Sequence, residues 1–338
     1  MTRNQIDKLI SEGVFPEPTE HHELVGTHIS WVILCDAYVY KIKKPIKYSF
    51  LDFSTLERRK YFCERELELN QRFSKGIYLE VLPVYEHEGG CYVGGKKGVL
   101  IDFALKMRKL DSEKQMDVLL RNNNVSTKDI KSLAATIVHF HNNTTIIYKK
   151  NVLDIKEKFN DLGAEKEFLS KKLGDGYGKT IEETLVVSNT FLNENKELLE
   201  DRLRSGFFRD CHGDLHARNI FLLPEPQPFD CIEFNESYRQ IDVLNEVAFL
   251  CMDLDALGRK DLSDLFITQY NFLFPSIRNK AEKRLFSYYK SYRANVRAKV
   301  NSLRAKSASN NADKTTALTE VKRYLALMES YLKSLDTG

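Results

Sequence analysis

One polar stretch of the sequence combines the residue types that phosphoryl transfer requires. It holds His212, Asp214 and Asn219 in the order His-x-Asp-Leu-x-x-x-Asn, and a second acid, Asp230, follows a Pro-rich turn. A carboxylate can accept the proton of an attacking hydroxyl group, while amide and carboxylate oxygens are ligands that suit Mg²⁺. The spacing therefore indicates a site for magnesium-assisted phosphoryl transfer.

Short apolar runs at 220–223 and 229–232 flank the Pro-rich turn, and together they predict a hairpin. This hairpin would return Asp230 to the side of Asn219, so that both oxygen ligands could face one ion. The alternative is that these residues only shape loops and cap helices, because Asp, His and Asn are common in both roles. The extended pattern favours the functional interpretation.

The composition is that of an ordinary globular protein. Of 338 residues, 42% are hydrophobic and 29% are charged, which is enough to bury a substantial core. A net charge of +3 is too small to argue for a nucleic acid or an anionic membrane as partner. The sequence has no apolar run of membrane-spanning length, and its first residues lack the apolar centre of a signal peptide. We therefore expect a cytoplasmic protein, and the sequence does not indicate its oligomeric state.

The six cysteines are widely separated and include no Cys-x-x-Cys pair. A zinc site would need closer pairs of ligands, and a disulfide framework is typical of small secreted chains. We therefore expect buried thiols without disulfides.

The N-terminal third alternates between strand and helix patterns. A lysine inside the strand predicted at 37–44 could reach a phosphate group, although a solvated edge strand would also carry lysines. A helix should begin at Ser54 as N-cap, with Glu57 at the capping-box position. The predicted elements are a helix at 4–12, strands at 25–36 and 37–44, a helix at 54–73, and strands at 79–86, 90–94 and 98–107.

The rest of the chain is mainly helical, so the strand at 98–107 is the expected boundary between two lobes, 1–107 and 108–338. The apolar spacing predicts helices that begin at a capping box at 126–129 and continue at 151–172, 178–204, 241–254 and 284–304, with a last one at about 318–335.

A short glycine-rich segment, GYGKT at 176–180, resembles the end of a phosphate-binding loop, but Leu173 stands where the full motif needs Gly. The preceding residues are helical in pattern, whereas the motif should follow a strand. We therefore reject this segment as a nucleotide site.

The sequence resembles the aminoglycoside phosphotransferase and choline kinase branch of the protein-kinase-like fold. The motif HGDLHARNIF at 212–221 is similar to that family's catalytic loop, FDCIE at 229–233 to its metal-binding segment, and LAATIVHFH at 133–141 to its helix ending in His. The segments VYKIKKP, LDFSTLERR and YRANVRAK resemble a bacterial subgroup that is described only as aminoglycoside-phosphotransferase-like.

The resemblance implies an α+β, two-lobed fold with an N-terminal antiparallel sheet plus helix, a larger helical C-terminal lobe, and ATP and Mg²⁺ as cofactors. It implies that Lys41 holds the nucleotide phosphates and pairs with Glu66, with Lys43, Glu64 and Glu68 as alternatives. The resemblance also implies the following roles: Asp214 as catalytic base, Asn219 and Asp230 as magnesium ligands, Met107 and Arg108 in the hinge at the adenine, and Asp242 as a tether of the catalytic loop.

Two positions depart from the family pattern. The segment at 24–32 has only Gly26 in place of a glycine-rich loop, and Glu246 replaces an Asp. We expect an ATP- and magnesium-dependent phosphotransferase acting on a hydroxyl group of a small molecule such as an amino sugar, aminoglycoside, sugar or amino alcohol. The alternative is a nucleotide-binding regulatory module without turnover; a protein kinase is disfavoured because no activation segment precedes the helix at 241.

Four acids downstream could receive a cationic acceptor, or could be ordinary surface charges. They are Glu233, Glu236, Asp253 and Asp255.

Overall fold

The computed structural model describes residues 1–48, 51–95 and 97–335, which form two compact units. The first unit comprises Met1–Val118 and Asn219–Tyr238. The second comprises Leu119–Arg218 and the chain from Arg239 onward. The segment with Asn219 and Asp230 therefore belongs to the first unit, and Asp214 belongs to the second.

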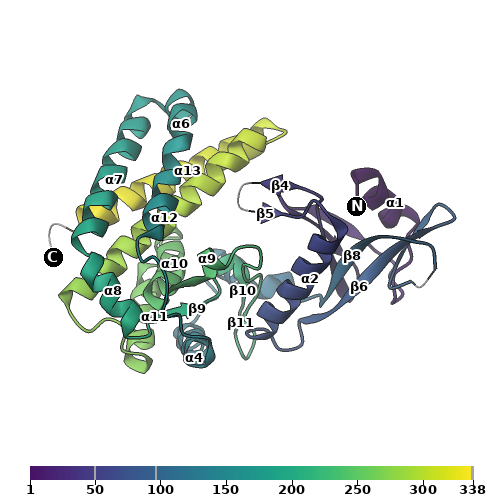
Figure 1. The fold of residues 1–338 in the computed structure, drawn as a ribbon, viewed down its shortest axis with the longest axis horizontal. Coiled ribbons are helices and arrows are strands. Elements are labelled where there is room, and N and C mark those ends of the chain that lie inside the picture. The colour runs from purple at the N-terminus through teal and green to yellow at the C-terminus, as the bar shows by residue number, and fades with distance from the viewer. Residues whose placement is uncertain (49–50, 96, 336–338) are drawn as a thin grey trace. The chain divides into compact units, whose positions relative to one another are not determined.

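The first unit is built on a six-stranded antiparallel sheet with the strand order β1-β2-β3-β8-β6-β7. Helix α2 lies along β6 and β8 (Figure 1). Between α1 and the sheet lies an apolar core that includes Ile6, Leu9, Ile33 and Val84. The elements are α1 (Arg3–Glu12), β1 (Glu23–Gly26), β2 (Ser30–Leu34), β3 (Tyr38–Lys43), β4 (Lys47–Tyr48), β5 (Leu51–Asp52), α2 (Leu56–Gln71), β6 (Tyr78–His87), β7 (Gly90–Val93), β8 (Val99–Arg108), β10 (Ile220–Phe221), β11 (Gln227–Pro228) and α9 (Glu236–Arg239).

The strands predicted at 25–36 and 37–44 are present, but the first of them is divided into β1 and β2. Residues 27–29 form a turn, so that β1 and β2 pair with each other while β2 also pairs with β3. Thr27 explains the interruption, because its backbone N–H and hydroxyl both bond to the Ser30 carbonyl. The short turn stands where a glycine-rich loop was expected from the family.

Helix α2 begins one residue later than predicted. Thr55, not Ser54, is the N-cap, and its hydroxyl accepts a hydrogen bond from the Arg58 N–H. Ser54 is occupied elsewhere, because its N–H and its hydroxyl both donate to Asp52. This local competition between two neighbouring hydroxyl residues shifts the start of the helix.

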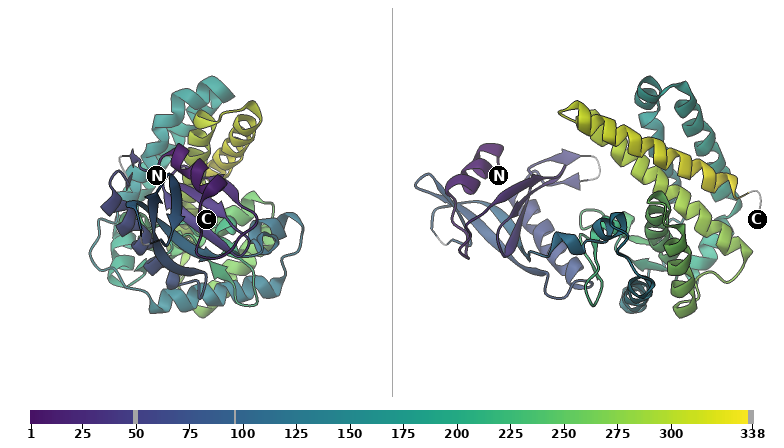
Figure 2. Two further views of the ribbon diagram at one scale, coloured as in Figure 1. Left: turned by 90° about the vertical axis from the view of Figure 1, so that its right-hand side faces the viewer. Right: turned by 180° about the vertical axis from the view of Figure 1, so that it is seen from behind.

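The second unit is helical except for a short pair of antiparallel strands, β9 and β12. Helices α12 and α13 run side by side (Figure 2), and every residue from Val243 to Leu254 of α10 is buried. Its elements are α4 (Thr127–Asn143), α5 (Asp154–Asn160), α6 (Lys166–Leu173), α7 (Asp175–Glu194), α8 (Lys196–Arg204), β9 (Phe208–Asp210), β12 (Gln240–Asp242), α10 (Val243–Ala256), α11 (Lys260–Leu273), α12 (Lys280–Ser307) and α13 (Asn311–Lys333), and α3 (Met116–Arg121) spans the boundary between the units.

The break predicted at 174–178 is a single residue. Gly174 has φ 108°, a conformation that favours glycine, and α7 starts at the next residue. The GYGKT segment is thus the first part of a helix and not a phosphate loop. The predicted helix at 151–172 is divided into α5 and α6, and α11 was not predicted.

All six cysteines are buried, and no disulfide joins them, as predicted. In the described part of the chain, no helix combines the length and the apolar character that crossing a membrane would require.

Candidate functional site

Strand β3 brings two lysines to one carboxylate in the first unit. β3 lies inside the sheet between β2 and β8, so the solvated edge strand is excluded. Lys41 Nζ lies 2.7 Å from Glu66 Oε1, and Lys43 Nζ lies 2.8 Å from Glu66 Oε2. Residues two apart on a strand face the same side, which explains why both lysines reach the same acid on α2.

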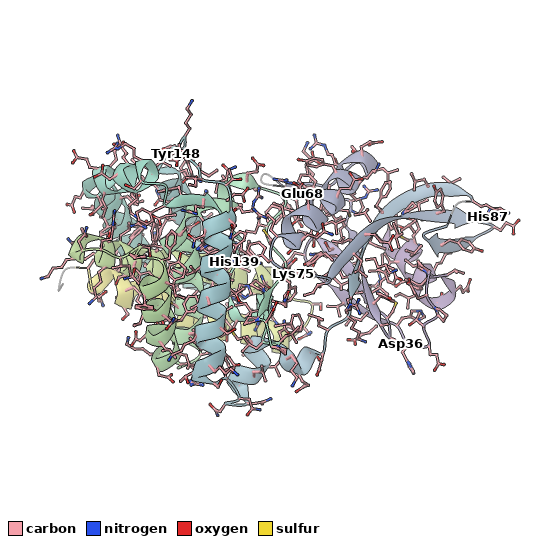
Figure 3. All side chains as sticks on the ribbon, turned by 90° about the horizontal axis from the view of Figure 1, so that it is seen from below. Asp36, Glu68, Lys75, His87, His139 and Tyr148 are labelled. Carbon is pink, nitrogen blue, oxygen red and sulfur yellow. The ribbon has the colours of Figure 1, made fainter. Side chains whose placement is uncertain are left out.

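The helical phase of α2 selects Glu66 among the three candidate acids. Glu66 is fully buried, whereas Glu64 faces Lys60 and Glu68 faces Arg65, and both of these acids are exposed. Figure 3 labels Glu68 on α2. Burial alone would raise the pKa of Glu66, but the two ammonium groups outweigh it and lower the pKa to about 2. Glu66 is therefore ionised at neutral pH.

The segment that follows β11 adds two further acids to this network. Lys41 Nζ lies 2.7 Å from Asp230 Oδ1, and Lys43 forms a buried ion pair with Glu233. Burial would lower the pKa of Lys41, yet the carboxylates of Asp230 and Glu66 raise it well above its usual value. Lys41 is therefore a fixed cation between two carboxylates.

Asp230 has an uncommon backbone conformation, with φ 63° in the left-handed region. Its N–H donates to the Tyr78 hydroxyl at 2.9 Å, and the next N–H, of Cys231, donates to Asn70 Oδ1 at 2.9 Å. Side chains of the first unit thus hold the chain on both sides of the strained residue. Such strain is a recurrent feature of functional sites, where it aims a side chain that regular structure could not place.

The predicted hairpin is shorter than expected. β10 pairs with β11 at Gln227–Pro228 and not with 229–232, because the left-handed conformation of Asp230 ends the extended chain. The Phe229 N–H still donates to the Asn219 carbonyl at 2.9 Å. This bond places the backbone of Asn219 next to the residue that precedes Asp230, so the two predicted metal ligands come from neighbouring segments.

The donor set in this part of the first unit fits a hard divalent cation. Asn219 offers an amide and Asp230 a carboxylate that is 43% exposed. The network of Glu66, Asp230 and Glu233 holds three carboxylates against the two ammonium groups of Lys41 and Lys43. A cation next to the exposed Asp230 would offset this excess negative charge.

Asp214, in the second unit, is held in its ionised form. Its Oδ2 lies 3.4 Å from His216 Nε2, and its N–H donates to His212 Nδ1 at 3.3 Å. Burial alone would raise the pKa of Asp214, but His216 and the charge of Arg297 outweigh it and hold that pKa well below the usual range. The carboxylate can therefore accept a hydrogen bond, and then a proton, from a hydroxyl group.

Helix α10 and helix α12 hold the loop that carries Asp214. Glu246 accepts hydrogen bonds from the N–H groups of His212 at 2.6 Å and Gly213 at 3.0 Å. Asp253 accepts from the Ala217 N–H at 3.0 Å, and Arg293 donates to the Gly213 carbonyl at 3.0 Å. The loop backbone is thus fixed at three residues.

The tether expected from Asp242 is made by Glu246 instead. Asp242 caps α10 by accepting from the Leu244 N–H, and it forms a bidentate ion pair with the buried Arg202. Glu246 lies one helical turn further along and points at the loop. The sequence signal was its position in the family's Asp-Leu-Ala pattern.

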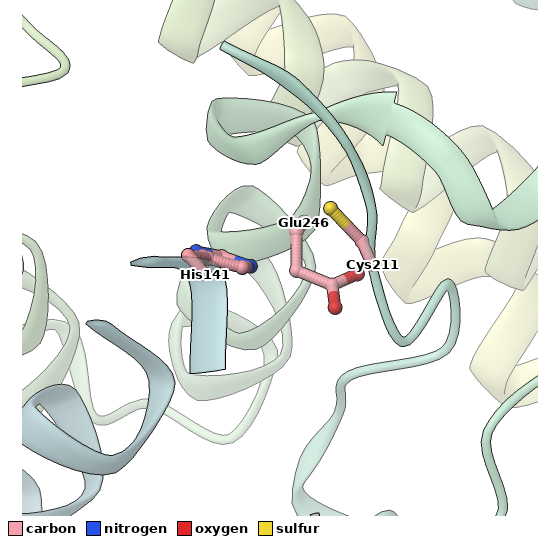
Figure 4. A group of neighbouring side chains, drawn as sticks. All are labelled: His141, Cys211 and Glu246. Atoms are coloured by element: carbon pink, nitrogen blue, oxygen red, sulfur yellow. The ribbon is translucent and has the colours of Figure 1, made fainter. Parts of the chain in front are cut away.

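His141, Cys211 and Glu246 form a buried group beneath the loop (Figure 4). Their potential ligand atoms lie within 4.8 Å of one another, and His141 Nδ1 is 2.7 Å from the Tyr270 hydroxyl. His141 Nε2 has no hydrogen-bond partner, and both Glu246 oxygens already accept backbone N–H groups. A bridging water would satisfy this arrangement without a metal ion.

The residues expected at the adenine lie at the end of β8. Met107 pairs with Val39 and with Tyr78, while the Arg108 N–H donates to the Ile77 carbonyl at 2.8 Å. Their backbones are therefore engaged in the sheet, and contact of Met107 and Arg108 with a nucleotide stays a prediction.

No family profile matches the sequence. Curated relatives are uncharacterized proteins from Mycobacterium tuberculosis and Mycobacterium bovis, 29% identical over 314 residues. The alignment covers 91% of this chain and 59% of each relative, so the chain spans less than two thirds of their length.

Several solved structures resemble the whole chain. A choline kinase from Cryptosporidium parvum has a TM-score of 0.57 at 10% identity, covering 93% of this chain and 90% of its own. A choline/ethanolamine kinase family protein from Mesorhizobium loti has a TM-score of 0.50 at 13% identity, covering 98% and 100%. A proposed aminoglycoside phosphotransferase from Ralstonia eutropha has a TM-score of 0.50 at 10% identity, covering 98% of each chain.

The chain therefore has the protein-kinase-like fold shared by choline/ethanolamine kinases and aminoglycoside phosphotransferases. The predicted fold class is confirmed. At these identities the likeness concerns the fold, and the reaction has to be argued from the residues.

Proposed function

We propose that the protein is an ATP- and magnesium-dependent phosphotransferase that acts on a hydroxyl group of a small molecule. The observation that carries the proposal is the position of Lys41, whose ammonium group bridges Glu66 and Asp230. Packing alone does not explain a cation that is held between two acids. A kinase site does explain it, because the lysine binds the nucleotide phosphates, one acid positions the lysine and the other acid binds the metal ion. The ionised Asp214 supplies the second requirement of the reaction.

In the proposed reaction, the acceptor oxygen forms a bond to the γ-phosphorus of ATP. The bond from that phosphorus to the bridging oxygen breaks, and its electron pair leaves with ADP. Asp214 orients the acceptor hydroxyl and takes its proton, and Lys41 binds phosphate oxygens of the nucleotide. Mg²⁺, held by Asn219 and Asp230, would neutralise charge on the phosphates.

Binding of the nucleotide is tested first by thermal unfolding with ATP and MgCl₂. A ligand that binds only the folded state raises the melting temperature. We expect a magnesium-dependent rise for the wild type, and its loss in Asp230→Asn. Glu236→Gln is the matched control, because it removes a nearby acid that is exposed and lies outside the lysine network. No rise with any nucleotide would contradict the proposal.

Turnover is tested second, by ADP release with sugars, aminoglycosides and amino alcohols as acceptors. The alternative is a nucleotide-binding module without turnover. The observation that favours it is the short turn at 27–29, which stands in place of a glycine-rich loop. Nucleotide binding without ADP release for any acceptor would favour that alternative. Acceptor-dependent ADP release that Asp214→Asn abolishes would favour the transferase.

A further inference from the structure

Arg297 is a partly buried cation without a carboxylate in direct contact. It lies on α12, and its guanidinium stacks over the Tyr324 ring at 5.5 Å. Its Nε is buried and has no hydrogen-bond partner. Among the residues that the structure describes, no carboxylate forms an ion pair with Arg297.

Four other arginines are buried, and the Nε of each donates a hydrogen bond, in Arg293 to Asn245 and in the other three to an acid. Arg202 pairs with Asp242 at 2.6 Å and Glu282 at 2.8 Å, Arg239 pairs with Asp210, and Arg59 pairs with Asp102 at 2.8 Å. A buried polar atom without a partner is costly, so the unpartnered Nε of Arg297 marks a position that a ligand could complete. Arg297 departs from the pattern of its neighbours.

Two acids act on Arg297 only at a distance. Burial would lower its pKa, and Tyr324, Asp253 and Asp214 outweigh burial and raise it. Asp253 is engaged elsewhere, since it accepts from the Ala217 N–H at 3.0 Å and from the Tyr324 hydroxyl at 3.4 Å. Asp214 is engaged by His216. Arg297 is thus linked through Tyr324 and Asp253 to the Ala217 N–H of the catalytic loop, and its Nε has no hydrogen-bond partner.

The acids that a cationic acceptor would need in the second unit are occupied. Asp255 pairs with Lys290 at 2.9 Å and accepts from the Tyr331 hydroxyl, and Asp253 holds the loop. The strongest charges acting on Asp214 come from basic groups, namely His216, Arg297 and His212, and the buried Glu246 acts on it as well. The surroundings of Asp214 suit an anion better than an ammonium group.

We propose that Arg297 forms an anion-binding subsite beside Asp214, which takes a phosphate or carboxylate group during the reaction proposed above. Guanidinium groups bind such oxyanions through charge-assisted hydrogen bonds. The anion has two possible sources, the phosphoryl group in transfer or a permanent anionic group on the acceptor. The inference rests on the proposed function for the identity of the anion, and on the unpaired Arg297 for its existence.

The subsite is tested by the binding of inorganic sulfate at matched ionic strength. The rise in melting temperature with sulfate concentration measures this binding. The variants are Arg297→Met, which keeps the bulk of the side chain, and Arg304→Met as control. Arg304 lies seven residues along the same helix and is 38% exposed. We expect sulfate to stabilise the wild type and the control, and to bind Arg297→Met about tenfold to a hundredfold more weakly. No stabilisation of the wild type, or an equal effect in Arg297→Met, would overturn the subsite.

Stability without sulfate separates a ligand-binding role from a structural one. If the role of Arg297 is to bind a ligand, its replacement by Met removes an uncompensated charge. The melting temperature of the variant without sulfate is then equal to that of the wild type or higher. Arg202→Met should lower it strongly, because two buried acids lose their partner. A fall in Arg297→Met as large as that in Arg202→Met would assign Arg297 a structural role and overturn the proposal.

Kinetics distinguish the two sources of the anion. Arg297→Met and the wild type are compared with paired acceptors such as glycerol and glycerol 3-phosphate, or glucose and glucose 6-phosphate. A rise in the KM of the variant that is confined to the anionic acceptor would show that Arg297 binds the anionic group of the acceptor. An equal fall in the kcat of the variant for both acceptors would show that Arg297 binds the phosphoryl group in transfer. Unchanged kinetics for both would overturn the subsite. Loss of the nucleotide-dependent thermal shift in the wild type is a separate result, which would overturn the proposed function itself.

Discussion

The Lys43 ammonium group and the Glu233 carboxylate form an ion pair from which water is excluded, with side-chain exposures of 0% and 4%. The pair joins β3 to the chain three residues beyond Asp230. Lys43 also binds Glu66, so α2, β3 and the Asp230 segment converge on one buried cation. The geometry of the site in the first unit therefore depends on a lysine that is not itself expected to touch a phosphate.

The Lys43–Glu233 pair should be a major contribution to stability. Lys43→Met leaves Glu233 buried without a cation, and the expected loss in the free energy of unfolding is roughly 3–5 kcal/mol. Lys43→Met/Glu233→Met should lose less than the sum of the two single variants, because Glu66 retains Lys41. Urea unfolding of the two single variants and the double variant measures these losses in the free energy of unfolding.

The control for this cycle is the exposed pair of Lys260 and Asp264, with side-chain exposures of 73% and 61%. Its removal should change the free energy of unfolding by less than about 1 kcal/mol. Additive losses for Lys43 and Glu233 would show that the two side chains act independently, contrary to the structure.

Lys41 and Lys43 should separate into functional and structural roles. Lys41→Met leaves Glu66 paired with Lys43 and leaves Asp230 open to solvent, so stability should fall less than in Lys43→Met. Turnover should fall roughly 10²–10³-fold, the cost of losing one preorganised charge at the phosphates. ADP release and urea unfolding, measured on both variants, check the division. The opposite pattern would make Lys43 the phosphate-binding residue.

Asp214 should be ionised throughout the range from pH 5 to 8. Its pKa is depressed, so the catalytic carboxylate persists as pH falls and is lost only well below the usual pKa of an Asp side chain. Asp214→Asn should lower kcat roughly 10²–10⁴-fold at every pH. A pH–rate profile from pH 5 to 8 tests this, and a limb in that range that vanishes in Asp214→Asn would contradict it.

The sequence predicted the elements of the site better than their contacts. The His-x-Asp spacing and the Lys-x-Lys alternation depend on local periodicity, which one sequence displays. The choice of Glu66 over Glu64 and Glu68 depends on which face of α2 packs against the sheet, and local periodicity alone does not decide among the three acids.

Contacts between distant segments could not be predicted in this way. Nothing in the sequence indicates that Glu233 binds Lys43, 190 residues away, or that Glu246 rather than Asp242 holds the catalytic loop. These pairings require the tertiary fold. The unpaired state of Arg297 is likewise visible only when its surroundings are known.

Glu246 gives a pH dependence of stability opposite in sign to that of the buried Glu66, whose pKa is lowered. Burial raises its pKa to about 7, against a usual value of 4.5, and the charge of Arg293 and the two loop N–H groups offset burial only in part. The folded state therefore binds more protons than the unfolded state between these values. The contribution of Glu246 to stability is complete below pH 4.5 and is lost as pH rises through 7, by at most about 3 kcal/mol.

Urea unfolding at a series of pH values, for the wild type and Glu246→Gln, measures this contribution. The difference between the two curves is the relevant quantity, because burial lowers the pKa of His141 to about 3 and so gives an opposite slope below pH 6.5 in both proteins. We expect the wild type to lose stability relative to Glu246→Gln between pH 5 and 7. Glu64→Gln, an exposed acid, should track the wild type. Parallel curves for the wild type and Glu246→Gln would mean that Glu246 stays ionised against the loop.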